Sequence, residues 1–123
     1  MEDMSEFSLA VKDRWDWTLM MMQPAVVTQD AFASAREQAL RKKALPALEK
    51  IRLEAYHEGL SVQILYYGAY ADEGPTIARM HAFLRDGGYV TNGKHHEIYL
   101  GDPRRTPPEK LKTVIRQPVR KAA

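Results

Sequence analysis

The chain has 123 residues, of which 45% are hydrophobic and 28% charged; its formal net charge is +2 and it contains no cysteine. This length suits one globular domain, and the lack of cysteine excludes disulfides and thiolate chemistry. The small net charge gives no reason to expect nucleic acid as a partner, and no stretch approaches the roughly 18 apolar residues of a membrane span.

The first regular element is expected after a flexible N-terminal segment. Residues 1–14 begin with acidic side chains and lack the apolar core of a signal peptide, so we expect them to be mobile and the protein to be cytoplasmic. Residues 15–23 (WDWTLMMMQ) carry large apolar side chains on both alternating faces, which predicts a strand covered on both sides. Pro24 ends this strand.

A helix is predicted from Thr28, whose hydroxyl can accept a backbone N–H at the helix start, to about Lys43. Its apolar residues form a narrow stripe on one side. Residues 51–56 alternate between apolar and polar side chains and predict a strand. Residues 60–67 (LSVQILYY) give the strongest strand pattern in the chain.

The second half predicts a helix and two more strands. The helix begins near Pro75, a favoured first-turn residue, and ends at 87–88, where two glycines follow each other. Residues 95–100 (HHEIYL) and 112–119 predict the last two strands, before a basic tail at 120–123. This order of elements predicts an α+β fold, in which two helices cover one face of a twisted antiparallel sheet and the other face stays open.

Glu97 is the candidate functional carboxylate. Alternation along 95–100 places it with Tyr99 and away from the apolar side chains, so we expect both on the face that the helices leave open. Composition alone leaves two interpretations: an exposed acid paired with a lysine, or a carboxylate among aromatic rings that binds a cation or acts as a base. In the second case, the strand at 60–67 is expected to bring Tyr67 or Gln63 nearby.

Aromatic and methionine side chains can surround a flat or cationic ligand, because ring faces attract cations and methionine adapts to varied shapes. Ordinary core packing is the alternative interpretation of the same residues. The expected ligand contacts are Trp17, Met20, Met22, Tyr56, Tyr67, Tyr70, Glu97 and Tyr99, of which Glu97 and Tyr99 are also the candidate catalytic residues.

The four histidines do not predict a metal site. His95 and His96 are neighbours on a strand, so their side chains point to opposite faces and cannot bind one ion without distortion. The sequence contains no HExxH, P-loop, Gly-x-Ser-x-Gly or dinucleotide-binding motif. We therefore expect neither a metal nor a cofactor.

Three long stretches are distinctive: WTLMMMQP (17–24), RLEAYHEGLSVQILYYGAY (52–70) and KHHEIYLGDPRRTPPEKLKTVIRQPV (94–119). Together they resemble the C-terminal part of GyrI-like small-molecule-binding proteins. The resemblance covers 15–119 and implies one domain of that family. It implies a fold of two strand–helix–strand–strand modules related by a pseudo-twofold axis, with the ligand in the cleft between them and with Glu97 and Tyr99 in that cleft.

The family includes the ligand-binding domains of multidrug-sensing regulators and hydrolases that open the cyclopropane ring of DNA-alkylating natural products. The resemblance therefore implies binding of hydrophobic molecules that are cationic or electrophilic. Ring-opening hydrolysis, with Glu97 polarising a water and Tyr99 or Tyr67 aligning the substrate, is one alternative. Regulatory docking on another protein is the other.

The sequence departs from the family pattern in two places. It lacks the strand and helix with which stand-alone members begin, so the first module is incomplete. The loop at 69–74 (AYADEG) keeps Tyr70, Asp72 and Glu73 but loses the prolines and one acid of the family motif. The incomplete module leaves apolar surface on residues 15–22, which predicts a homodimer in which a second copy covers it.

Overall fold

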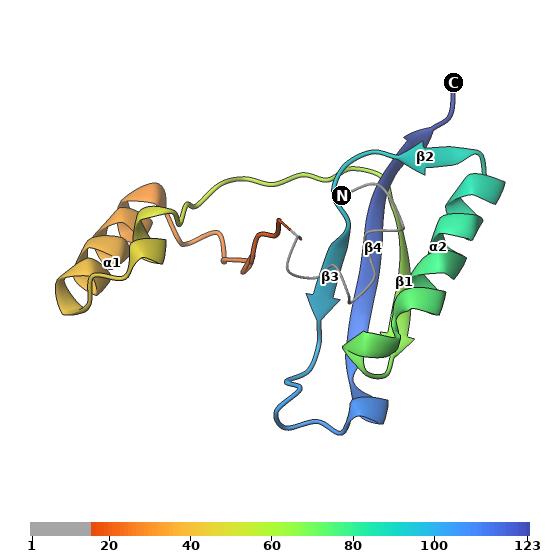
Figure 1. Ribbon diagram of the computed structural model, residues 1–123. Coiled ribbons are helices and arrows are strands. Elements are labelled where there is room, and N and C mark those ends of the chain that lie inside the picture. The colour runs from red at the N-terminus through yellow and green to blue at the C-terminus, as the bar shows by residue number, and fades with distance from the viewer. Residues whose placement is uncertain (1–15) are drawn as a thin grey trace. The chain divides into compact units, whose positions relative to one another are not determined.

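A computed structural model describes residues 16–123, which divide into two compact units (Figure 1). Residues 17–57 make up the first, here called the N-terminal unit, and residues 58–123 belong to the second, the sheet unit. The segment at 1–14 that we expected to be mobile lies outside the described residues, as does Trp15.

The N-terminal unit contains the helix α1 (Gln29–Lys42) and a short 3-10 helix, η3 (Pro46–Glu49). Thr28 caps α1, because its Oγ1 accepts a hydrogen bond of 3.1 Å from the backbone N–H of Ala31. The predicted helix and its cap are confirmed. Gln29 Nε2 donates to the carbonyl oxygen of Leu53 at 2.7 Å, which ties the later part of this unit to the start of α1.

The two strands predicted in this region do not form. Residues 16–24 and 51–59 have no strand structure, and neither segment pairs with another strand among residues 16–123. A strand is stable when its backbone N–H and C=O groups bond to a neighbouring strand. Alternating side chains, which motivated both predictions, do not supply that neighbour.

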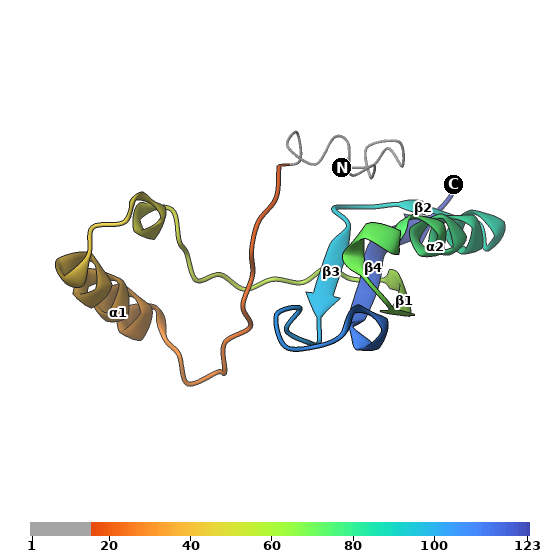
Figure 2. The same ribbon diagram turned by 60° about the horizontal axis from the view of Figure 1, so that its bottom comes forward.

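The sheet unit combines one helix with a four-stranded antiparallel sheet, which confirms the predicted α+β class (Figures 1 and 2). The long strand β4 is central and pairs with all three others. The elements are β1 (Ser61–Tyr67), η4 (Tyr70–Asp72), α2 (Gly74–Asp86), β2 (Tyr89–Thr91), β3 (His96–Tyr99), η5 (Pro108–Lys110) and β4 (Lys112–Lys121).

β1, α2, β3 and β4 form where the sequence predicts them, whereas β2 was not predicted. β2 is three residues long, which is too short to show an alternating pattern. Its position comes from the turn before it. Gly88 has a φ of 83°, a left-handed conformation that favours glycine, and the chain then runs back along the end of β4.

The hydrophobic core lies between α2 and one face of the sheet. Ile77 and Met80 of α2 pack with Ile115 at the centre of β4. Ile115 is fully buried and lies opposite Ile64 of β1 in the ladder. Residues directly opposite each other in an antiparallel pair project to the same face, so this register identifies the face that α2 covers.

Candidate functional site

Glu97 and Tyr99 lie on the face of the sheet that α2 covers. The β3–β4 register pairs Glu97 with Ile115 and Tyr99 with Thr113, and both of these β4 residues are 0% exposed. The prediction that placed Glu97 and Tyr99 on the open face is wrong. Alternation divides a strand into two faces, but tertiary packing decides which face the helix covers.

Glu73 meets Glu97 at the start of α2. Glu73 is the N-cap residue of this helix and is only 5% exposed, and its side chain hydrogen-bonds to that of Glu97. Burial, the hydrogen bond and the charge of Glu97 together raise the pKa of Glu73 to about 9. Glu73 is therefore protonated at neutral pH and acts as the hydrogen-bond donor of the pair.

Glu97 is the charged member of the pair. Burial by itself would raise the pKa of Glu97, but hydrogen bonds from His95 and Glu73 outweigh it and lower the pKa below its ordinary value. His95 Nε2 lies 3.6 Å from Glu97 Oε2, and its side chain is 8% exposed. The two acids, side by side, thus carry one negative charge and one proton.

Two tyrosines stand beside the acids. The rings of Tyr70 and Tyr99 lie 5.2 Å apart between centroids and are inclined at 54°. Burial and the charge of Glu97 raise the pKa of Tyr99 to about 12, so its phenol keeps its proton. Tyr99 remains 53% exposed, and the group therefore reaches the protein surface. We call Glu73, Glu97, His95, Tyr70 and Tyr99 the carboxyl cluster.

A hydrogen bond on β1 positions the loop that carries Tyr70 and Glu73. The hydroxyl of Tyr66 donates to the carbonyl oxygen of Ala69 at 2.7 Å. Gly68 turns the chain with a φ of 140°, and a side chain at this position would collide with the Tyr66 hydroxyl. The loop is thereby held where Glu73 can meet β3.

Several buried polar atoms around the cluster have no hydrogen-bond partner within the described part of the chain. They include Oε1 of Glu73, Nε2 of His81 and Oγ1 of Thr113. Burial, together with the nearby His95, lowers the pKa of His81, so this side chain is neutral at pH 7. Unsatisfied buried polar groups are rare in proteins and are common where a ligand or water binds.

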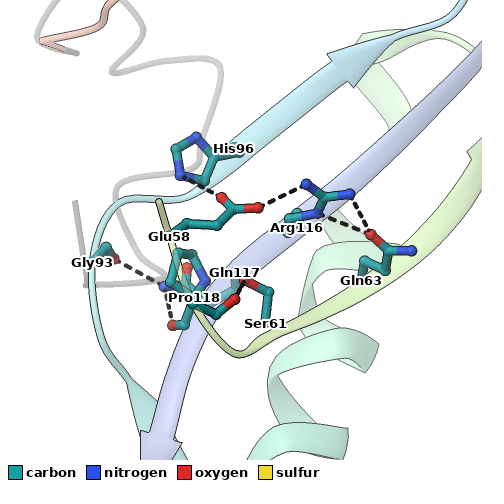
Figure 3. Close-up of polar contacts among 9 residues, drawn as sticks. Glu58, Ser61, Gln63, Gly93, His96, Arg116, Gln117 and Pro118 are labelled. Carbon is teal, nitrogen blue, oxygen red and sulfur yellow. Dashed lines mark hydrogen bonds and ion pairs between the residues drawn. The ribbon is translucent and has the colours of Figure 1, made fainter. Parts of the chain in front are cut away.

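The opposite face of the sheet carries a separate polar network (Figure 3). Arg116 Nη1 donates to Glu58 Oε1 at 2.7 Å, while its Nε and Nη2 donate to Gln63 Oε1 at 2.9 and 2.7 Å. His96 Nε2 lies 3.2 Å from the other oxygen of Glu58. His95 and His96 thus point to opposite faces, as predicted.

Tyr67 and Gln63 are on this open face and do not approach Glu97. Gln63 pairs with Arg116 in the β1–β4 ladder, and Tyr67 pairs with Lys112, whose Nζ lies 5.6 Å from the centre of the Tyr67 ring. The expectation that β1 brings either residue to Glu97 is wrong, because β4 separates β1 from β3 and the two side chains project from the other face.

The remaining predicted ligand contacts divide between the two units. Tyr70, Glu97 and Tyr99 come together in the carboxyl cluster. The other four belong to the N-terminal unit, where each is more than half exposed, and their role as ligand contacts stays a prediction: Trp17, Met20, Met22 and Tyr56.

A shallow pocket lies between α2 and β1, away from the acids. Its walls include Ile64 of β1 and Met80 and Phe83 of α2, and its charged lining residue is Arg79. Phe83 is 70% exposed there. Because this pocket is lined by apolar groups, the amide of Gln63 and the cation of Arg79, it lacks the acid–base chemistry of the carboxyl cluster.

Comparison with known proteins identifies the family. The family model of the GyrI-like small molecule binding domain matches residues 23–120. The chain belongs to the GyrI-like family. Among curated proteins, none matches the chain. As for membranes, no helix of this GyrI-like chain within residues 16–123 is long and apolar enough to cross one.

Solved structures from Listeria innocua are similar to this GyrI-like chain. The crystal structure of a hydrolase has 37% sequence identity and a TM-score of 0.69, covering 80% of this chain and 52% of that one. The structure of an uncharacterized conserved protein has 39% sequence identity and a TM-score of 0.72, covering 80% of this chain and 50% of that one. The chain spans about half the length of these two proteins.

Two residues of the cluster were not predicted as site residues of this GyrI-like domain, namely Glu73 and His95. Glu73 belongs to the loop that the family resemblance had already marked, and it directly precedes the start of α2. That position was its one signal in the sequence. His95 shares the face of Glu97 by simple alternation, and its role becomes visible only once that face is known to be buried.

Proposed function

We propose that this GyrI-like domain binds a hydrophobic small molecule with a single positive charge at the carboxyl cluster. The observation that carries the proposal is the hydrogen bond between Glu73 and Glu97, in which one acid keeps its proton and the other is ionised. The pair holds one negative charge largely shielded from water. Such a charge favours a cation that has apolar groups of its own.

The tyrosines supply the apolar part of the recognition. The faces of aromatic rings attract cations, and the attraction grows when water is excluded. Tyr99 is half exposed and so is accessible to a ligand, and the ring of Tyr70 lies 5.2 Å from its ring between centroids. The phenolic proton of Tyr99 stays in place at neutral pH, which leaves the hydroxyl as a hydrogen-bond donor for a polar atom of the ligand.

Calorimetric titration tests this proposal with two probes of similar shape. Tetraphenylphosphonium carries a permanent positive charge, whereas triphenylphosphine oxide is neutral. We expect the cation to bind at least about tenfold more tightly than the neutral probe. Glu97→Gln should weaken cation binding by about 1–3 kcal/mol, the range for a charge-assisted contact.

Glu109→Gln is the matched control for that titration, because Glu109 is an exposed acid outside the cluster. It should bind the cation as the wild-type protein does. Equal affinity for the two probes, or unchanged cation binding by Glu97→Gln, contradicts the proposal.

We propose hydrolysis of a strained electrophile as the second candidate function. Two adjacent acids with pKa values driven apart are a common arrangement for acid–base chemistry. Glu97 would accept a proton from a water, and the water oxygen would bond to a carbon of an activated cyclopropane. The electrons of the broken C–C bond would pass to the electron-withdrawing group of the substrate, which Tyr99 would align.

A solved structure named a hydrolase is similar to this chain, which supports testing this reaction. Incubation with a cyclopropane activated by a conjugated carbonyl should give a product heavier by one water. Glu97→Gln should lower the rate roughly 100-fold or more, the scale of lost general-base catalysis. An unchanged rate contradicts the role of Glu97, and the absence of a hydrated product contradicts the reaction.

A homodimer and a cytoplasmic location complete the proposal. The dimer is supported by a run of exposed apolar side chains in the N-terminal unit. Leu19 is 81% exposed, Met21 83% and Met22 96%. Contiguous apolar surface of this kind commonly marks an interface.

A further inference from the structure

Glu73 has unusual surroundings for a buried acid. The titratable groups that interact with it come from three elements: Glu97 and Tyr99 on β3, Tyr70 on η4, and Tyr66 on β1. None of these is a lysine or an arginine. The nearest histidine nitrogen is His95 Nε2, 3.6 Å from Glu97 Oε2.

Of the two acids, Glu73 is therefore neutralised by a proton rather than by a fixed cation, and Glu97 keeps its negative charge. Glu73 shares its proton with Glu97, and its Oε1 has no hydrogen-bond partner in the described part of the chain although the residue is 5% exposed. An acid oxygen that is buried and unpaired lacks the bonds that water would give it. A cation placed against the pair would compete with the shared proton for the same carboxylate oxygens.

We propose that a bound monocation takes the place of the proton that Glu73 and Glu97 share, so that each binding event releases a proton to the solvent. The O–H bond of Glu73 breaks, the proton passes to the buffer, and both carboxylates then face the charge of the ligand. This inference rests on the proposed binding function, because it concerns the same site. It adds that the affinity for cations depends on pH.

The direction and size of this dependence follow from electrostatics. A positive charge about 5 Å from Glu73, at an effective dielectric constant of about 20, lowers the pKa of the acid by roughly two units. Starting from a pKa of about 9, Glu73 would then lose its proton near neutral pH. Because a proton leaves when the cation binds, cation affinity should rise with pH, by up to about tenfold per unit.

Calorimetry measures the released proton directly. Tetraphenylphosphonium is titrated into the full chain at pH 8 in phosphate and in Tris, two buffers that differ in ionisation enthalpy. The difference in observed heat gives the number of protons, which we expect to lie between about one half and one for wild type. The dissociation constant should fall about tenfold or more between pH 7 and pH 9. Triphenylphosphine oxide should release no proton.

Variants assign the proton to Glu73. Glu73→Gln should bind tetraphenylphosphonium with no proton release and with a flat pH profile, whereas the exposed-acid control Glu109→Gln should behave as wild type. Proton release that persists in Glu73→Gln overturns the proposal. Should Glu73→Gln fail to fold, the infrared carbonyl band of a protonated carboxyl group in wild type gives the same answer, because it should disappear when the cation binds.

The outcomes also separate this inference from the proposed function. Binding of the cation without proton release, and with equal affinity at pH 7 and pH 9, overturns the exchange and leaves the binding function standing. A complete failure of tetraphenylphosphonium to bind overturns both.

Discussion

Glu73 at the start of α2 and Glu97 on β3 share a hydrogen bond across the interface between the helix and the sheet. Each acid alters the other: the charge of Glu97 helps Glu73 to keep its proton, and that proton helps Glu97 to stay ionised. The two acids therefore titrate as a pair. This relationship makes the stability of the fold depend on pH.

Stability should fall as the pH rises, and Glu73→Gln should remove that fall. The pKa of Glu73 is raised from 4.5 to about 9, so the folded state holds a proton that the unfolded state loses between these values. Its contribution is complete below pH 4.5 and is lost as the pH approaches 9. One pKa unit corresponds to about 1.4 kcal/mol. We therefore expect the free energy of unfolding of the variant, relative to that of wild type, to rise by at least about 1 kcal/mol between pH 6 and pH 9.

Urea unfolding followed at several pH values measures this difference. Glu109→Gln, which changes an exposed acid, should keep the pH dependence of wild type. Parallel stability curves for wild type and Glu73→Gln between pH 6 and pH 9 would contradict the raised pKa.

Glu97→Gln should lower the pKa of Glu73 while the protein stays folded. Burial is the largest cause of the raised pKa, and the hydrogen bond and charge of Glu97 add to it. The glutamine removes the added charge, so the pKa should fall but remain above 4.5. Carbon-detected NMR of the Glu73 carboxyl group measures both values. An unchanged pKa would mean that the two acids do not interact.

The polar network on the open face should contribute measurably to stability. Glu58 bonds both Arg116 and His96, and its side chain is 17% exposed. Arg116→Ala removes the arginine and leaves the largely buried Glu58 with His96 as its remaining partner, so it should cost about 1–3 kcal/mol. Arg41→Ala is the control. It removes an ion pair with Glu37 whose side chains are 73% and 66% exposed, and it should cost less than about 1 kcal/mol.

Equal losses in Arg116→Ala and Arg41→Ala would show that the network on the open face adds nothing to stability. Urea unfolding at neutral pH gives both values.

The sequence predicted elements better than it predicted their surroundings. The patterns for β1, α2, β3 and β4 are local, and tertiary packing agrees with them. The strands predicted at 15–23 and 51–56 require a partner strand, which a pattern within one segment cannot reveal. Likewise, alternation correctly grouped Glu97 with Tyr99. It could not show that their face lies against α2, nor that Glu73 would meet them there, because the register of β3 on β4 decides both.

The homodimer should depend on the exposed apolar residues of the N-terminal unit. We expect light scattering at micromolar concentration to give twice the mass of one chain. The double change Met21→Ser and Met22→Ser removes two side chains that are 83% and 96% exposed, and it should give monomers, since the interface loses its apolar area. Phe83→Ser, which removes an exposed apolar residue of the sheet unit, is the control and should leave the dimer intact. A wild-type monomer contradicts this prediction.

Thr113→Val should stabilise the ligand-free protein. Thr113 is 0% exposed, and its Oγ1 has no hydrogen-bond partner among the described residues. A buried hydroxyl without a partner costs free energy, and valine has nearly the same shape without the hydroxyl. We expect a gain of about 0.5–1 kcal/mol in the free energy of unfolding.

Tyr66→Phe is the opposite case, because it deletes a hydroxyl that donates to the carbonyl oxygen of Ala69 at 2.7 Å. It should lower the free energy of unfolding by about 1 kcal/mol.

Thermal and urea unfolding of the two variants decide the matter together. If Thr113→Val destabilises the fold as Tyr66→Phe does, then the Thr113 hydroxyl has a partner, for which a buried water beside the carboxyl cluster is the candidate. If Thr113→Val stabilises the fold and also weakens binding of tetraphenylphosphonium, the unpaired hydroxyl serves the ligand. That combination would show that a buried polar atom without a partner, which lowers the stability of the free protein, contributes to ligand binding.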